Sequence, residues 1–367
     1  MSTKSMCLAV ALAAAGALTV VAQEGQPPDP QRTPGVQAGQ DPKYREFVMA
    51  NCKTPPPPPA PRGGGPGRGG ARAGGPPQPV TATENYTINA IPGIVAQGAR
   101  WRLLWSDMGN NADGPVYFNG GLHVAQNDRS QVQKIDMNGQ ATVVYNNTFT
   151  GGSLAANASG QVFIAERALN QAIWLLEPER RLFTNTFNGE PLDCTGPGVL
   201  NDMTADGKGG VYFTKGGVYY ANPQGVVMGR FGTVGGNGII LSPDQKTLYV
   251  TGRLQGATPP AGVQGNGGLV AFDVQADGSL TNERQFAWVG GDGSAVDSQG
   301  RIYTTGDGTI YVVSPQGQVL GTIATPRPLI SVTFGGPDRK TLFGVAIRDV
   351  QIFALPMQAE GVAGRPK

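Results

Sequence analysis

The chain has 367 residues, of which 56 are glycine and only 15% are charged, and its formal net charge is +2. This composition excludes a charged helical bundle, and so small a net charge favours neither nucleic acid nor an anionic membrane as a partner. It is typical of many short strands joined by Gly, Asn, Asp and Pro turns.

The first 22 residues are predicted to be a secretory signal peptide. Lys4 precedes an apolar stretch over residues 6–22, which ends in small residues that suit cleavage after Ala22. The stretch is short for a membrane span, although an uncleaved anchor is the alternative. We expect a secreted or periplasmic protein with no membrane span after cleavage. Cys52 and Cys194 remain in the mature chain, and an oxidising compartment would allow them to pair.

Residues 23–80 are predicted to be a disordered linker. A proline run at residues 55–59 favours polyproline II, and residues 63–75 are rich in glycine with scattered arginines. Almost nothing in this region is apolar, so it has no core to bury. It is either a solvated spacer or a weak tether to an anionic surface. A short helix is expected over residues 41–50.

An internal repeat begins near residue 81 and predicts the fold. Each unit opens with a small or polar residue, forms an apolar strand, turns at Asx or Gly, and returns in a second strand that carries an aromatic residue. The units open at Asp113, Ser153, Asn201, Asn237, Asp292 and about Ile330. They lie 36 to 55 residues apart, which is close to the length of a four-stranded propeller blade.

The sequence therefore predicts an all-β fold, a six-bladed β-propeller over residues 81–360, with a disordered N-terminal extension and a tail at 361–367. Strands such as 132–139 and 310–317 are expected to form the outer halves of the blades. A strand near residues 86–91 is expected to complete the last blade.

The residue that opens each repeat is expected to point into the central channel, which the innermost strands line. Four of these residues carry amide or carboxylate oxygens: Asp113, Asn201, Asn237 and Asp292. Such ligands suit a hard divalent cation, Ca²⁺ first and then Mg²⁺ or Mn²⁺. Asp-Gly and Asn-Gly are also ordinary turn dipeptides, so the prediction depends on their recurrence at one position of the repeat.

At these motifs the chain resembles the family of gluconolactonase, regucalcin (senescence marker protein) and luciferin-regenerating enzyme. The resemblance covers about residues 100–356, and the segments that carry it are 112–117, 236–250, 291–297 and 334–342. It implies a metal-dependent hydrolase that opens a lactone, with one divalent ion, usually calcium but alternatively Mg²⁺, Mn²⁺ or Zn²⁺. The family holds this ion with a Glu, two Asn and an Asp.

The resemblance implies a role for each channel residue. Asn237 matches a metal-binding Asn, and Asn201 matches the Asn that contacts metal or substrate. Asp292 matches the metal-binding Asp that also serves as general base or nucleophile. Asp113 stands where the family usually has Glu, so the metal is expected to shift toward the first blade or to bind through water.

Three other positions depart from the family pattern. Val199 stands where lactone hydrolases of the family often have Arg, Arg167 where many have His, and Lys215 where many have Asp. Arg167 and Lys215 are interpreted either as a substrate-binding rim for an anionic group or as solvated loop charges.

The chain has one histidine, His123, which excludes mechanisms and zinc sites that need several histidines. Because His123 lies on a predicted second strand, which does not line the channel, we expect it to have a structural role. A small-molecule substrate is expected, and the oligomeric state is not predicted. Two other functions remain open. One is a non-catalytic exported propeller that binds ligands or serves as a scaffold, and the other is a related ester or phosphotriester hydrolase.

Overall fold

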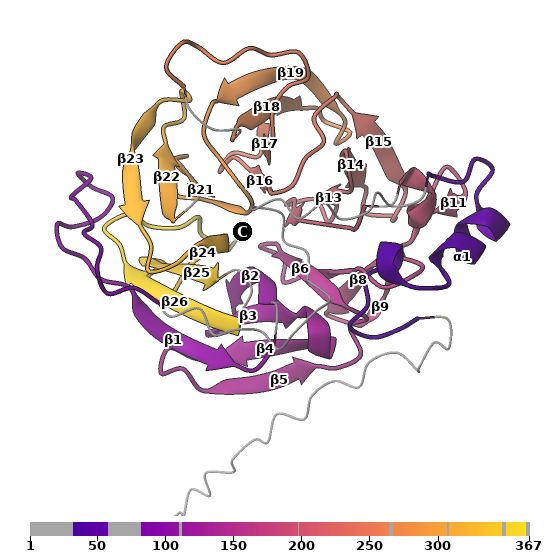
Figure 1. Cartoon of the computed structure of the whole chain (residues 1–367), viewed down its shortest axis with the longest axis horizontal. Coiled ribbons are helices and arrows are strands. Elements are labelled where there is room, and N and C mark those ends of the chain that lie inside the picture. The colour runs from indigo at the N-terminus through magenta and orange to yellow at the C-terminus, as the bar shows by residue number, and fades with distance from the viewer. Residues whose placement is uncertain are drawn as a thin grey trace, which may run out of the picture.

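Six four-stranded antiparallel sheets surround one central axis, as Figure 1 shows. The computed structural model describes residues 32–57, 82–109, 112–196, 198–263, 267–306, 308–346 and 350–364. The predicted all-β fold, a six-bladed β-propeller, is confirmed. The predicted signal peptide at 1–22, most of the predicted linker and the last three residues of the tail lie outside the described residues.

The first five blades follow one another along the chain, and each begins with its innermost strand. Blade one contains β2 (Ala112–Phe118), β3 (Gly121–Gln126), β4 (Gln131–Ile135) and β5 (Ala141–Tyr145). Blade two contains β6 (Gly151–Ala156), β7 (Val162–Glu166), β8 (Ala172–Glu177) and β9 (Arg181–Thr184). Blade three contains β12 (Met203–Ala205), β13 (Val211–Thr214), β14 (Val218–Ala221) and β15 (Val227–Phe231). Blade four contains β16 (Ile239–Leu241), β17 (Thr247–Thr251), β18 (Leu269–Val274) and β19 (Leu280–Ala287). Blade five contains β20 (Ser294–Val296), β21 (Ile302–Thr305), β22 (Thr309–Val313) and β23 (Val319–Ala324).

The sixth blade closes the ring with a strand from the other end of the propeller. It contains β24 (Leu329–Gly335), β25 (Thr341–Ala346), β26 (Val350–Pro356) and, outermost, β1 (Arg102–Asp107). β1 runs antiparallel to β26, and β24 contacts β2 of the first blade, so the two ends of the propeller meet and the ring is closed.

The predicted closing strand at residues 86–91 is wrong, because β1 takes that place. Within residues 86–91 only Ile91 forms a β-bridge, an isolated one with Val95. Ile88 and Ile91 are buried in a cluster that includes Tyr303 of blade five and Phe334 of blade six. Their side chains therefore fill the space between two blades instead of extending a sheet.

Small residues near the axis explain how the blades converge. The innermost strand β6 reads Gly-Gly-Ser-Leu-Ala-Ala, and all six residues are buried. The outermost strand β5 begins with exposed residues. Larger rings pack between neighbouring blades, such as Tyr303 of blade five against Phe334 of blade six with centroids 4.9 Å apart.

The segment at residues 32–57 packs on blade two and on the connection that follows it, so the prediction of disorder is wrong there. The predicted helix is confirmed as α1 (Tyr44–Asn51), and its Tyr44 and Val48 side chains pack against Leu169. Cys52 forms a disulfide with Cys194, with Cα atoms 5.5 Å apart. The remaining short elements are η1 (Ala38–Gln40), η2 (Asn127–Arg129), η3 (Leu192–Thr195), β10 (Thr186–Phe187) and β11 (Glu190–Pro191). Figure 1 shows α1 beside β11.

Over the residues that the structure describes, no helix has the length and apolar character needed to cross a membrane.

Candidate functional site

The four predicted metal ligands lie at one end of the channel. Asp113 is the second residue of β2, and the other three stand two residues before β12, β16 and β20: Asn201, Asn237 and Asp292. Because the innermost strands of a propeller all start at the same end, these residues surround one opening. All four are half-buried.

Arg167 connects the sites of the first and third blades. It follows β7 directly, and its Nη2 atom lies 3.1 Å from Asp113 Oδ2. Its Nε donates to the carbonyl oxygen of Leu200 at 2.7 Å, and Nη2 also donates to the carbonyl oxygen of Asn201. One guanidinium therefore bridges blades one, two and three.

Backbone contacts continue this arc to blades four and five. The Asn201 N–H donates to the carbonyl oxygen of Thr214 at 2.8 Å, and the Thr214 hydroxyl donates to the carbonyl oxygen of Asn237 at 2.5 Å. Gly238, which follows Asn237, lies directly against the backbone of Asp292. The structure thus brings together the predicted residues of blades one, three, four and five.

One oxygen of the predicted ligands has no partner among the described residues. The Oδ1 atom of Asn237 is buried and accepts no hydrogen bond from the described residues. A buried acceptor without a partner is costly, and a hard cation is one partner that would satisfy it. Among the described residues no group of three or more His, Cys, Asp or Glu side chains is placed to hold a metal. A cation here would therefore depend on amide oxygens as well as on Asp292.

Threonine hydroxyls hold the backbone of this site, and the sequence analysis missed them. Three second strands end in threonine: Thr214, Thr251 and Thr305. Their hydroxyl oxygens accept hydrogen bonds from the N–H groups of Asp202 (3.2 Å), Gly238 (2.6 Å) and Asp292 (3.1 Å), respectively. The signal was present in the sequence, because each of these strands carries an aromatic residue shortly before its final threonine.

Asp202 is a second residue that the sequence analysis missed. Its carboxylate accepts hydrogen bonds from the Ser153 hydroxyl at 2.8 Å and from the Ile239 N–H at 3.1 Å. These contacts tie blades two, three and four together beside Asn201. Ser153, predicted to face the channel, is buried and bound to this carboxylate. Of these two neighbouring residues, Asn201 lies at the channel opening, whereas Asp202 has a structural role between blades.

The two cations predicted to form an anion-binding rim both donate to protein oxygens. The Lys215 ammonium donates to the carbonyl oxygens of Gly196 and Gly198, each at 2.7 Å. Burial lowers the pKa of Lys215 to about 8, and the nearby Asp193 carboxylate opposes this effect. Arg167 and Lys215 are both buried. Their predicted contact with substrate stays a prediction.

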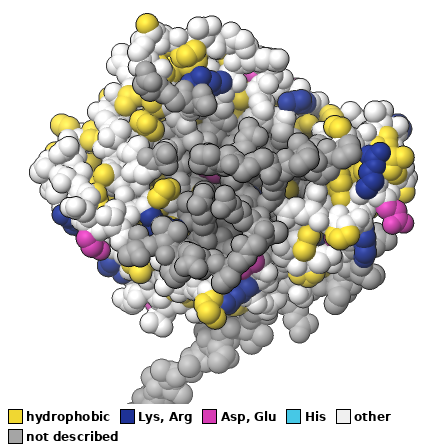
Figure 2. All heavy atoms as spheres, in the orientation of Figure 1, with side chains coloured by type: hydrophobic (Ala, Val, Ile, Leu, Met, Phe, Trp, Pro, Cys, Tyr) yellow, Lys and Arg dark blue, Asp and Glu magenta, His cyan; other side chains and the backbone are white. Residues whose placement is uncertain are grey.

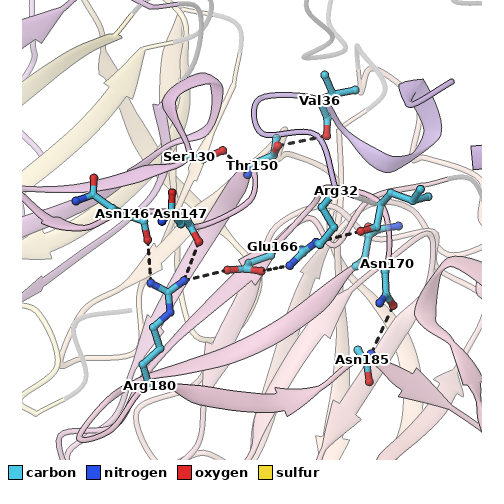
Figure 3. Close-up of polar contacts among 12 residues, drawn as sticks. Arg32, Val36, Ser130, Asn146, Asn147, Thr150, Glu166, Asn170, Arg180 and Asn185 are labelled. Atoms are coloured by element: carbon cyan, nitrogen blue, oxygen red, sulfur yellow. Dashed lines mark hydrogen bonds and ion pairs between the residues drawn. The ribbon is translucent and has the colours of Figure 1, made fainter. Parts of the chain in front are cut away.

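A buried ion-pair cluster forms around Glu166, the residue before Arg167, and Figure 3 shows Glu166 between Arg32 and Arg180. Glu166 is fully buried and pairs with Arg32 at 2.7 Å and with Arg180 at 3.4 Å. Burial raises the pKa of Glu166, while the two guanidinium groups oppose this shift. Because removing one partner from a buried pair leaves a charge uncompensated, the cluster fixes this part of the fold.

His123 lies away from the site, as its structural role requires. It is buried in β3, its Nδ1 lies 3.2 Å from the carbonyl oxygen of Gly121, and its ring stacks on Phe118. Burial lowers the pKa of His123 to about 3. The residue is therefore neutral in the folded protein at ordinary pH.

A separate hollow of about 270 Å³ lies at the other end of the channel, near the last residues of β2 and β6. Its lining includes Tyr117, Ala156 and Phe334 and none of the predicted ligands.

On the face shown in Figure 2, Lys and Arg side chains lie in ones and twos around the periphery instead of in one basic patch.

Comparison with known proteins gives matches of two kinds. Lactonase drp35 from Staphylococcus aureus is 29% identical over 169 residues, which are 40% of this chain and 49% of that protein. The chain thus spans about half the length of the curated relatives it matches. A gluconolactonase structure from Xanthomonas campestris matches with a TM-score of 0.63 at 24% identity, and the match covers 77% of this chain and 98% of the gluconolactonase chain. The calcium-binding protein regucalcin from Agrobacterium tumefaciens has a TM-score of 0.57 at 19% identity, with 73% and 97% covered.

The family model for the SMP-30/Gluconolactonase/LRE-like region matches residues 93–348. This range contains all four predicted ligands, the arginine that contacts Asp113 and Asn201, and the threonines that hold the backbone of the site. The match covers more than half of the chain, and we conclude that this protein belongs to the SMP-30/gluconolactonase/LRE-like family.

Proposed function

We propose that this protein hydrolyses a lactone with the help of a divalent cation at the channel opening. The observation that carries the proposal is the buried, unpartnered Oδ1 of Asn237 in the same arc as Asp292. Asp113, Asn201, Asn237 and Asp292 would hold the cation. Ca²⁺ fits these oxygens best, and Mg²⁺, Mn²⁺ or Zn²⁺ are the alternatives. The lactonase and gluconolactonase names of the relatives support the same reaction class.

Asp292 is proposed as the catalytic residue. Its backbone N–H is fixed by the Thr305 hydroxyl and its side chain is half-buried at the opening. A water molecule attacks the ester carbonyl carbon while Asp292 takes its proton. The bond between that carbon and the ring oxygen then breaks, the ring oxygen is protonated, and a hydroxy acid results. When bound, the cation supplies Lewis acidity toward the ester carbonyl.

Asn201 is proposed to orient the substrate. Its backbone is held on both sides, by Thr214 through its N–H and by Arg167 through its carbonyl oxygen. The amide side chain thus starts from a fixed backbone, which lowers the entropy lost when it binds a substrate hydroxyl.

We propose that the protein works outside the cytoplasm, after removal of residues 1–22. The Cys52–Cys194 disulfide supports this, because such bonds persist in oxidising compartments. Fractionation of producing cells tests it: the mature chain should appear in the periplasmic or extracellular fraction. A chain that keeps residues 1–22 and stays in the cytoplasm would contradict the proposal.

The reaction is tested with the mature chain, residues 23–367, on a panel of aldonolactones and acyl-lactones. Ring opening is followed as acid release, with Ca²⁺ and again after chelation. The proposal expects release that chelation abolishes. If no lactone is opened while Ca²⁺ still raises the melting temperature, a ligand-binding or scaffolding propeller is favoured. Release from other esters or phosphotriesters alone would indicate the related hydrolase.

A further inference from the structure

The guanidinium of Arg167 occupies a space that the fold keeps open for it. A Cβ at Gly152 would come within 1.8 Å of Arg167 Nε, so only glycine leaves this room. The Arg167 side chain is 4% exposed, against 18% for Asp113, its partner. Hydrogen bonds to the carbonyl oxygens of Leu200 and Asn201 hold it from the third blade.

The backbone around Arg167 is clamped by the N-terminal segment. The Ala38 N–H donates to the Arg167 carbonyl oxygen at 2.8 Å. Arg32 pairs with Glu166, the preceding residue, and its Nε donates to the carbonyl oxygen of Leu169 at 3.1 Å. Figure 3 shows Arg32 reaching Glu166 from outside the blade. Arg167 therefore cannot leave the channel by a movement of its own loop without breaking this buried cluster.

A fixed guanidinium changes the charge at the site. Asp113 already has one positive partner at 3.1 Å, in a place with little exposure to solvent. A divalent cation beside Asp113 would be repelled by Arg167, and poor solvation makes this repulsion stronger than in water. Asp113 thus offers a carboxylate that is already paired.

We propose that Arg167 is a resident cation of the site and competes with a divalent cation for Asp113. The inference rests on the proposed cation site and adds a competitor to it. It makes the affinity for the divalent cation lower than the oxygen ligands alone would give. Arg167 therefore determines the affinity for the divalent cation, and Gly152 leaves the space that Arg167 needs.

Calorimetric titration of the metal-free mature protein with Ca²⁺ tests the inference. We expect Arg167→Met to tighten Ca²⁺ binding at least tenfold, or about 1.4 kcal/mol. Gly152→Ala keeps the arginine but forces it from its place, and it should tighten binding in the same direction. Arg129→Met is the matched control, because Arg129 also pairs with an aspartate, but with Asp107 and not with Asp113. This control should leave the affinity within about twofold of wild type.

Melting temperatures in the absence of Ca²⁺ show whether each variant is folded, and Gly152→Ala decides the question if Arg167→Met does not fold. Unchanged or weaker Ca²⁺ binding in the folded variants would overturn the inference. So would equal tightening in Arg129→Met, which would indicate a general effect of charge. A failure of the proposed function can be distinguished from a failure of this inference, because lactone opening by the wild-type protein tests the proposed function.

Discussion

Gly238 of blade four lies so close to Asp292 of blade five that a Cβ at Gly238 would come within 2.2 Å of the Asp292 carbonyl oxygen. The glycine therefore serves the site by letting two innermost strands approach each other. It also fixes where the backbone of the proposed base lies.

Replacing this glycine is expected to damage both stability and activity. Gly238→Ala should lower the free energy of unfolding by about 1–3 kcal/mol, because the backbone of Asp292 has to shift. Lactone opening should fall at least tenfold. Gly235→Ala is the control, because a Cβ there meets nothing within 4 Å. Chemical denaturation and steady-state kinetics measure the two effects, and equal behaviour of the two variants would contradict the close-packing argument.

The stability of the protein should depend on pH through His123. Burial lowers its pKa to about 3, while the unfolded chain has an ordinary value of about 6.5. Between these values the unfolded state binds the proton and the folded state does not. The contribution of His123 to the free energy of unfolding is therefore complete above about pH 6.5. It is lost as the pH falls toward 3, by about 1.4 kcal/mol per pH unit.

His123→Asn keeps a donor near the Gly121 carbonyl oxygen and removes the titrating group. Denaturation of the variant and wild type at several pH values between 3 and 8 gives the difference between their free energies of unfolding. The gap between their free energies of unfolding should change with pH over this window. A constant gap would show that His123 is not the group responsible.

The disulfide should stabilise the fold by joining two distant parts of the chain. Cys52 and Cys194 are separated by 142 residues, so the bond restricts a long loop in the unfolded state. Reduction, or the double change Cys52→Ser and Cys194→Ser, should cost about 2–5 kcal/mol. The melting temperature of wild type should fall with a reductant, whereas that of the double variant should not change. An equal response of both would contradict this role.

Local patterns were sufficient to predict the blades. The Asx and Gly turns between alternating strands are short-range signals, and every predicted inner hairpin, from β2–β3 to β24–β25, is present. The closing strand was misplaced because residues 86–91 and 102–107 are both plausible strands. Burial of Ile88 and Ile91 between two blades decides between them, and this is a tertiary effect.

Long-range pairs explain what the sequence could not show. Disorder was predicted for residues 32–57 from composition, yet Arg32 pairs with Glu166, which is 134 residues away. In the same way, the position of Asp113 in the repeat was predictable, but its partner Arg167 lies 54 residues along the chain. The positions of candidate ligands follow from the repeat, whereas their charge partners depend on how the blades meet.

The most direct test of the account is lactone opening by Asp292→Asn beside the wild-type protein. The change is nearly isosteric and removes the proton acceptor, so turnover should fall by at least a thousandfold on a lactone that wild type opens. The melting temperature should stay within a few degrees of wild type, because the backbone contact to Thr305 is kept. Turnover retained by a folded Asp292→Asn variant would contradict the proposed mechanism.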